Sequence, residues 1–320
     1  MKTEIITSGQ NPKIKELLAL QEKSRTRREK GLFVVEGRRE LRHCIGAGFK
    51  VRTLFVCREI LGEEGLKEIL DGIGSRSEQC NVKTSKAEAK ADKAAIDKND
   101  GTKPEDTAKS GMNAEKNGLN TEKGGNEPEL MIIEVPKALY DKIAYRGGTE
   151  GVIAEVEWKE RGLKEIRLGE KPLIMVLEAV EKPGNLGAVL RSADAAGADA
   201  VIICDPLTDL YNPNLIRASI GAVFSRQVAT ASSEDTVRWL KKNGIKILTA
   251  QLQDSEWYYA EDMRGGVAIV MGTEATGLTD FWRKSADAHI KIPMLGQLDS
   301  LNVSVSAAIL LYEAVRQRNS

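Results

Sequence analysis

The C-terminal half of this 320-residue chain contains three polar, glycine-containing segments that could take part in chemistry. They are EKPGNLGAVLRSADAAGAD at 181–199, MGTEATGLTD at 271–280 and IPMLGQLDSLNVS at 292–304. Each follows an apolar run that is typical of a buried strand. Because ligands of open α/β sheets bind beyond the carboxyl ends of the strands, we expect the three segments to form one ligand-binding site.

The third segment is unusual because it introduces a mostly apolar helix with many hydrogen-bonding groups. Ser300 and Asn302 are residue types that cap helix starts well. One helix end needs one such cap, whereas this segment offers several candidates. Capping alone is the structural alternative to a ligand-binding role, and the segment by itself leaves both open.

Several other kinds of site are excluded or disfavoured. The three segments contain neither the Gly-x-Gly-x-x-Gly dinucleotide motif nor a phosphate-binding P-loop. The chain has only two histidines, which excludes a histidine-rich metal centre and disfavours a Ser–His–Asp triad. Its four cysteines are widely spaced and form no Cys-x-x-Cys pair, so neither a zinc site nor a disulfide framework is supported. We therefore expect no bound metal.

The elements that must position these segments alternate along the C-terminal half. Helices are expected near 186–196, 213–223, 233–243 and 303–317, with Ser232 and Asp235 capping the third. Strands are expected at 173–180, 200–205, 227–231, 246–252, 267–272 and 289–294. This alternation predicts a mostly parallel sheet with helices on both faces.

The N-terminal half also alternates strands and helices, which predicts a smaller α/β domain. A helix is expected over 11–30, then a strand at 32–37, a helix at 38–47, a strand at 51–56 and a helix near 61–71. Strands at 130–136 and 151–158 flank a short helix over 136–143. Between the helix near 61–71 and the strand at 130–136, the segment 76–129 has few bulky apolar residues and cannot bury enough surface to offset its ordering entropy, which predicts a disordered insertion. We expect domains at 1–158 and 171–320, joined by a linker at 159–170.

Composition limits the partners of the chain. Lys+Arg and Asp+Glu both number 47, so an anionic partner must be met by a local basic patch. One such patch is expected near the end of the first helix, and it comprises Lys23, Arg25, Arg27, Arg28 and Lys30. No run of 18 apolar residues and no N-terminal apolar stretch occurs, so we expect a cytoplasmic protein that does not enter a membrane.

The motifs NLGAVLRSADAAG, VMGTEATGL and IPMLGQLDSLNVSVSAAILLYE resemble, in order, the three motifs of the SpoU (TrmH-like) branch of the SPOUT RNA methyltransferases. The resemblance covers roughly the last 150 residues. The N-terminal pattern NPKIKELLALQ…RREKGLFVVEG resembles the L30e-like substrate-binding domain of the same enzymes. The resemblance implies a deep trefoil knot, a homodimer, S-adenosylmethionine as cofactor and 2′-O-methylation of RNA, with ribosomal RNA (23S) as the closest match.

The resemblance also implies residue roles. Arg191 would lie closest to the target hydroxyl, either as an unusually perturbed base or as an orienting and electrostatic group, and Asn185 and Glu274 would hold it in place. Ser300 and Asn302 match the paired polar residues of the third motif. The residues implied in cofactor binding are Met271, Gly272, Thr273, Gly277, Ile292, Pro293, Met294, Leu301 and Asn302.

Each role has a structural alternative. Asn185 could cap a helix, Glu274 could be an acid favoured by a helix dipole, and Arg191 could be a solvated helix residue. Arg217 and the basic patch could contact RNA phosphates or could be solvated surface groups. Rival functions are a tRNA 2′-O-methyltransferase, a base methyltransferase and a non-catalytic RNA-binding protein of the same fold.

Overall fold

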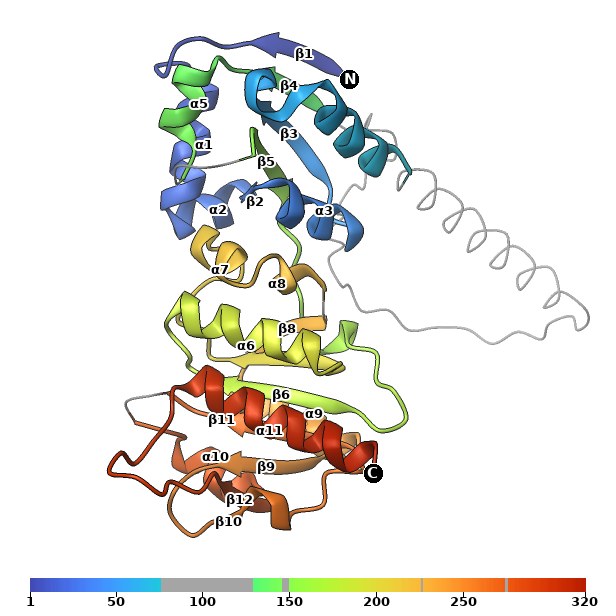
Figure 1. Cartoon of the computed structure of the whole chain (residues 1–320), viewed down its shortest axis with the longest axis vertical. Helices are drawn as coiled ribbons and strands as arrows, with labels where there is room; N and C mark the ends of the chain where they lie inside the picture. The colour runs from blue at the N-terminus through green and yellow to red at the C-terminus, as the bar shows by residue number, and fades with distance from the viewer. Residues whose placement is uncertain (76–128, 146–149, 226, 274–275) are drawn as a thin grey trace, which may run out of the picture.

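The computed structural model describes residues 1–75, 129–145, 150–225, 227–273 and 276–320. They form two α/β units, each built around one sheet, that are stacked along the long axis of the molecule (Figure 1). The expected insertion at 76–129 lies outside the described residues, apart from Glu129.

The first unit contains a mixed sheet in the order β1-β4-β3-β5-β2. Parallel pairs join β1 to β4 and β4 to β3, whereas β5 runs antiparallel to both β3 and β2. The strands are β1 (Lys2–Ile5), β2 (Leu32–Glu36), β3 (Val51–Val56), β4 (Met131–Glu134) and β5 (Val152–Glu157). The helices are α1 (Pro12–Glu22), α2 (Ser24–Lys30), α3 (Arg38–Gly46) and α5 (Lys137–Ile143), and residues 58–75 are also helical.

Alternation along β2 shows how the first sheet is covered on both faces. Val34 packs with α1 and α5 residues on one face, whereas Phe33 and Val35 point to the other, where α3 packs. The strand β2 therefore reads as a nearly continuous apolar run, whereas the edge strand β1 is exposed along its whole length.

The second unit contains a sheet in the order β10-β12-β9-β11-β6-β7-β8, and every pairing among the described residues is parallel. The strands are β6 (Leu173–Glu178), β7 (Ala200–Cys204), β8 (Gln227–Ala231), β9 (Lys246–Ala250), β10 (Glu256–Trp257), β11 (Val267–Met271) and β12 (Ala288–Lys291). The expected α/β fold with a mostly parallel sheet is confirmed.

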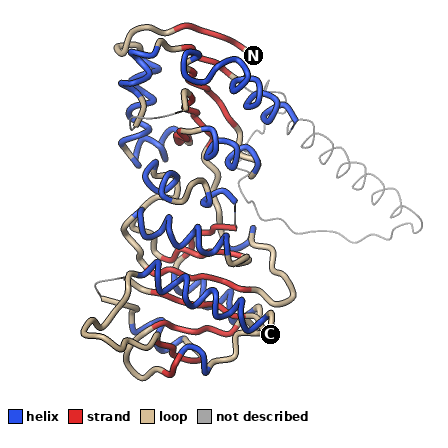
Figure 2. The backbone as a smooth tube through the Cα atoms, in the orientation of Figure 1, coloured by secondary structure: helices blue, strands red, loops and turns tan. Residues whose placement is uncertain are grey.

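Helices cover both faces of this second sheet (Figure 2). The helix α6 (Pro183–Ala195) and the C-terminal helix α11 (Val303–Arg318) pack side by side on one face. The other face is covered by α9 (Ser233–Lys242), which Ser232 caps as expected, and by α10 (Asp280–Ser285). The remaining helices are α7 (Pro213–Ala218), α8 (Ala222–Ser225), η1 (Leu163–Glu165) and η2 (Tyr258–Ala260).

The two units share one continuous apolar core. Phe33 of the first sheet stacks on Tyr211 of the second unit, with ring centroids 4.2 Å apart. Phe49 and Phe224 pack edge to face beside them, at 5.2 Å. Relative motion of domains is expected where the interface between them is small or polar, whereas these two units share one hydrophobic core, which fixes the relative position of the two sheets.

Three expectations about the elements are wrong in detail. The helix expected over 11–30 is broken at Lys23, whose backbone is extended, into α1 and α2. The helix expected over 213–223 is interrupted after Ala218 by a turn in which Ile220 and Gly221 have positive φ angles of 54° and 79°. The short elements β10 and α10 were not expected, because two and six residues are too few to show a periodic pattern.

Candidate cofactor and catalytic site

A cleft lies where β9, β11 and β12 end, at the carboxyl edge of the second sheet. Five residues expected to bind cofactor or to act in catalysis line it, namely Met271, Ile292, Met294, Ser300 and Leu301. The second and third polar segments of the sequence thus meet at one place, as their positions after parallel strands predict.

The loop after β11 is held in a narrow turn. Thr273 and Gly277 exchange two backbone hydrogen bonds of 3.2 and 3.1 Å, and Gly277 has a φ of +67°. A Cβ atom on Gly272 would lie 2.2 Å from the backbone of Gly277, so only glycine fits there. The loop is anchored where Thr279 donates two hydrogen bonds to the buried carboxylate of Glu178. The predicted residue Glu274 lies outside the described residues.

Asn302 joins the first and third polar segments. Its Oδ1 accepts hydrogen bonds from the backbone N–H and the hydroxyl of Ser304, so it caps α11. Its Nδ2 donates to Oδ1 of Asn185 on α6, 3.2 Å away. The helix α6 begins at Pro183 after the N-cap residue Lys182, so Asn185 lies inside the first turn and the capping alternative for it is wrong.

Arg191 lies about two turns further along α6 and does not line the cleft at the ends of β9, β11 and β12. It borders a neighbouring hollow, together with Arg39 and His43 of α3 and Tyr312 of α11. Its side chain is exposed. The structure therefore brings Asn185 and Asn302 into contact and places Arg191 on the same helix as Asn185, facing the junction of the two units.

The cleft has one wall that the sequence did not reveal. Ala250, Gln251 and Leu252, which follow β9, line it together with Lys291 and Asp299. The Oε1 atom of Gln251 is buried, and no described residue donates a hydrogen bond to it. An unpaired buried acceptor in a cleft is costly unless a ligand or water satisfies it. The only sequence signal was that the segment lies at the end of the strand expected at 246–252.

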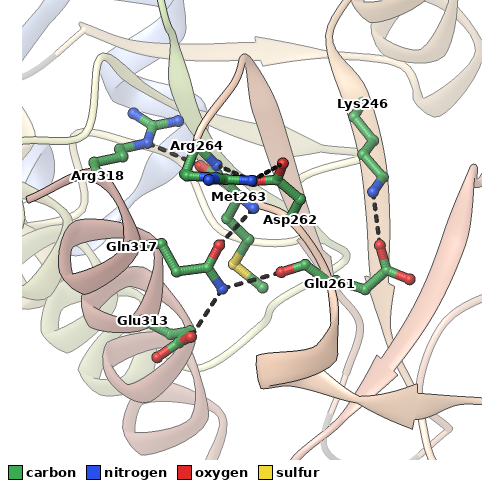
Figure 3. A network of polar contacts seen from close by, with 8 residues as sticks. All are labelled: Lys246, Glu261, Asp262, Met263, Arg264, Glu313, Gln317 and Arg318. Carbon is green, nitrogen blue, oxygen red and sulfur yellow. Dashed lines mark hydrogen bonds and ion pairs between the residues drawn. The ribbon is translucent and has the colours of Figure 1, made fainter. Parts of the chain in front are cut away.

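The C-terminal end of α11 is bonded to the loop before β11, as Figure 3 shows in part. The Arg318 guanidinium donates hydrogen bonds to the carbonyls of Lys171, Pro172, Met263 and Gly265, at 2.7 to 3.2 Å. Partial burial lowers the pKa of Arg318. Gln317 adds bonds to the backbone of Glu261 and Met263 and to the carboxylate of Glu313. The last turn is thereby fixed to the loop before β11.

The expected basic patch is only partly a surface patch. Arg27 is 2% exposed and bonds Asp209 at 2.6 Å and the carbonyls of Leu20 and Gln21, so it cannot contact RNA and its prediction as an RNA-binding residue is wrong. Lys23, Arg25, Arg28 and Lys30 are exposed, although Arg25 pairs with Glu29 and Lys30 with Glu16. Arg217 is exposed on α7.

Comparison with known proteins agrees with this arrangement. Residues 172–312 match the SpoU rRNA Methylase family, and residues 11–95 match the MRM3-like substrate binding domain. The 23S rRNA (guanosine-2'-O-)-methyltransferase RlmB of Pseudomonas putida is 37% identical over 179 residues, which cover 54% of this chain and 72% of that protein.

Two solved structures superpose over nearly the whole chain. A crystal structure of an RNA 2'-O ribose methyltransferase is 34% identical, with a TM-score of 0.71, and covers 99% of this chain and 100% of that one. An AdoMet-bound rRNA methyltransferase from Sinorhizobium meliloti has a TM-score of 0.75 at 24% identity, covers 99% of this chain and 98% of its own, and shows the same fold.

Fold, site and relatives together define an S-adenosylmethionine-dependent RNA 2′-O-ribose methyltransferase. The resemblance inferred from the three motifs is confirmed. The chain belongs to the SpoU rRNA methylase family.

Proposed function

We propose that this enzyme methylates the ribose 2′-hydroxyl of a guanosine in 23S ribosomal RNA. The observation that carries the proposal is the contact between Asn302 and Asn185. It joins the cap of α11 to α6, the helix that bears Arg191, and it lies beside the cleft that the second and third polar segments line. The relatives in the same family that act on guanosine in 23S rRNA support the choice of substrate.

The residues of the cleft fit S-adenosylmethionine. Apolar side chains of Met271, Ile292 and Leu301 suit a flat purine, and the orphaned Gln251 Oε1 is an acceptor for a ligand N–H group. The absence of a side chain on Gly272 allows the loop with Thr273 and Gly277 to fold tightly at the carboxyl end of β11. Pro293 restricts the backbone between Ile292 and Met294. Bound there, the cofactor supplies an electrophilic methyl group on its sulfonium.

We assign Arg191 an orienting and electrostatic role. A guanidinium carries only hydrogen-bond donors, so it suits a developing alkoxide or a phosphate better than it suits proton abstraction. Asn185, tied to Asn302, fixes the start of the helix that presents it, and Ser300 and Glu274 belong to the same proposed constellation. Removing Arg191 should lower kcat by roughly 10²-fold or more, as loss of an oxyanion-type donor does, with little change in cofactor affinity.

We further propose a homodimer with domains at 1–158 and 171–320, linked by 159–170, and a cytoplasmic location where ribosomal RNA is made. The N-terminal domain would bind RNA through Lys23, Arg25, Arg28 and Lys30. Support for a second copy comes from apolar side chains at 295–312 that face solvent, Leu295 being 96% and Leu298 75% exposed.

The trefoil knot stays a prediction. No helix among the described residues is long and apolar enough to cross a membrane.

The test is a comparison of ribosomal RNA from cells with and without this gene, by mass spectrometry of nuclease fragments. Loss of one 2′-O-methylguanosine from 23S rRNA, restored by the wild-type protein and not by Arg191→Ala, is the expected result. Loss of a methyl group from tRNA instead would refute the choice of substrate. Unchanged methylation of all RNA, together with no binding of S-adenosylmethionine by calorimetry, would refute the assignment as a methyltransferase. Light scattering in solution tests the dimer.

A further inference from the structure

Two hollows meet at the junction of the two units, and both are lined by the side chain of Arg39 on α3. One contains Arg217 of α7 and Tyr145, and the other contains His43 and Arg191. Because Arg39 borders both, the two hollows are neighbours, one beside α7 and the other beside α6. We call the surface made by Arg39, His43, Arg191 and Arg217 the junction groove.

We propose that the junction groove binds the sugar-phosphate backbone of the RNA strand that carries the target ribose, with Arg39 and His43 of the N-terminal domain as substrate-positioning residues. This inference rests on the proposed function, because it takes Arg191 as the group nearest the reacting hydroxyl. It assigns RNA binding to α3, which holds none of the residues that the sequence analysis expects to bind RNA.

Pairing of the charges on α3 supports the proposal. Arg38 and Arg42, one helical turn apart, both bond the carboxylate of Glu68, which they share as a counter-ion. Arg39 and His43, also one turn apart, face the groove instead. The Arg39 guanidinium has a single long contact, 3.8 Å from the carboxylate of its neighbour Glu40, and the imidazole of His43 forms no hydrogen bond or ion pair with any described residue.

The other groove cations are likewise available. The guanidinium groups of Arg191 and Arg217 have no hydrogen-bond or ion-pair partner in the part of the chain that the structure describes. The groove wall also carries the carboxylates of Glu36, Glu40, Glu150 and Asp194; Glu36 accepts the backbone N–H of Tyr145 and Glu150 accepts that of Arg38. The guanidinium groups of Arg39, Arg191 and Arg217 keep donors free for an external anion such as phosphate.

The backbone between α7 and α8 brings α3 close to α6. Ile220 has a φ of 54°, which is strained for a β-branched residue, and Gly221 follows at 79°. A Cβ atom on Gly221 would lie 3.2 Å from the side chain of His43 and 3.3 Å from the backbone of Glu40. This close approach, together with the shared apolar core, fixes His43 and Arg39 relative to Arg191. An RNA strand bound by Arg39 and His43 of α3 would therefore be held at a fixed position relative to Arg191 on α6.

The experiment measures RNA affinity by filter binding across a salt series, using a 23S rRNA transcript and wild-type, Arg39→Ala, His43→Ala and Arg42→Ala proteins. The control Arg42 is exposed on the same helix and its charge is already paired. We expect a roughly 3- to 10-fold loss of affinity for Arg39→Ala and His43→Ala, with the salt slope for Arg39→Ala reduced by about 1. KM for RNA should rise more than kcat falls, and Arg39→Lys should partly restore both slope and KM.

Affinity and salt slope of Arg39→Ala equal to those of Arg42→Ala would overturn the proposal. Calorimetric cofactor binding and thermal melting of each variant show that it is folded. If the wild-type protein transfers no methyl group to RNA and yet the salt slope falls for Arg39→Ala only, the proposed function fails while the groove stands as an RNA-binding surface.

Discussion

The ion pair between Arg27 and Asp209 offers the sharpest test of how the two units are joined. The two side chains are 2% and 3% exposed, and they meet at 2.6 Å although 182 residues separate them in sequence. Arg27→Met keeps a long apolar side chain and removes the charge. It leaves the Asp209 carboxylate buried with the backbone N–H of Tyr211, 3.0 Å away, as its remaining donor.

The expected cost follows from this burial. Breaking a buried pair by removing one partner costs about 3–5 kcal/mol, because the other charge stays desolvated without compensation. The carbonyls of Leu20 and Gln21 also lose their donor. In the double variant Arg27→Met/Asp209→Asn the stranded charge is absent and the amide can still accept from Tyr211, so more than half of the loss should be recovered.

The assay is urea unfolding of the four proteins of this double-mutant cycle, followed by circular dichroism, with Arg28→Met as control. Arg28 is the exposed neighbour, and its replacement should change stability by less than about 0.5 kcal/mol. The cycle should give a coupling energy of at least about 1 kcal/mol. If Arg27→Met were as stable as Arg28→Met and weakened RNA binding to a similar extent, Arg27 would be a surface RNA ligand and the reasoning from burial would be refuted.

Three further outcomes are expected. Gly272→Ala should weaken S-adenosylmethionine binding at least tenfold by calorimetry, since its Cβ overlaps the facing backbone, whereas Gly296→Ala, with open space around it, should bind normally. Arg318→Ala should lower the free energy of unfolding by about 2–3 kcal/mol through lost charge-assisted bonds to four carbonyls, whereas Arg264→Ala, which removes an exposed ion pair with Asp262, should cost under about 1 kcal/mol in the same urea assay. Burial raises the pKa of Glu155 from 4.5 to about 7, so the folded state holds this proton more tightly than the unfolded state. Stability should therefore fall by about 2–3 kcal/mol as pH rises from 5 to 8, and Glu155→Gln should lose this fall.

The parts of the fold that could be predicted from the sequence were those that depend on the hydrophobic pattern within one short segment. The parallel strands of the second sheet are buried on both faces, so β6, β7 and β11 read as continuous apolar runs whatever their neighbours are. The cleft could be placed because strand ends in such a sheet share one edge. In contrast, Gln251 carries no motif, and its position in the cleft depends on which strand pairs with β11.

Burial of single polar residues could not be predicted, because it depends on residues far away in sequence. Arg27 stands in a run of basic residues on a helix, and nothing nearby indicates that Asp209 will reach it. His43 carried no sequence signal either, since its place beside Arg191 follows from the turn at Ile220 and Gly221, which contacts α3 and leads into α8, the helix that packs on α6. Motif reasoning finds residues that share one segment, whereas these sites are made by packing between units.

The polar start of the apolar helix α11 is explained by the chemistry of one side chain. Asn302 accepts two hydrogen bonds at the helix end through Oδ1 and donates to Asn185 through Nδ2. Serine or aspartate could cap the helix, but an ionised aspartate cannot donate and a serine hydroxyl is shorter. An amide satisfies both demands, so capping and site assembly are the same interaction rather than alternatives. Methyl transfer between two positioned groups depends on orientation, and in the proposed site the helix α11, secured at one end by Asn302 and at the other by Arg318, would provide it.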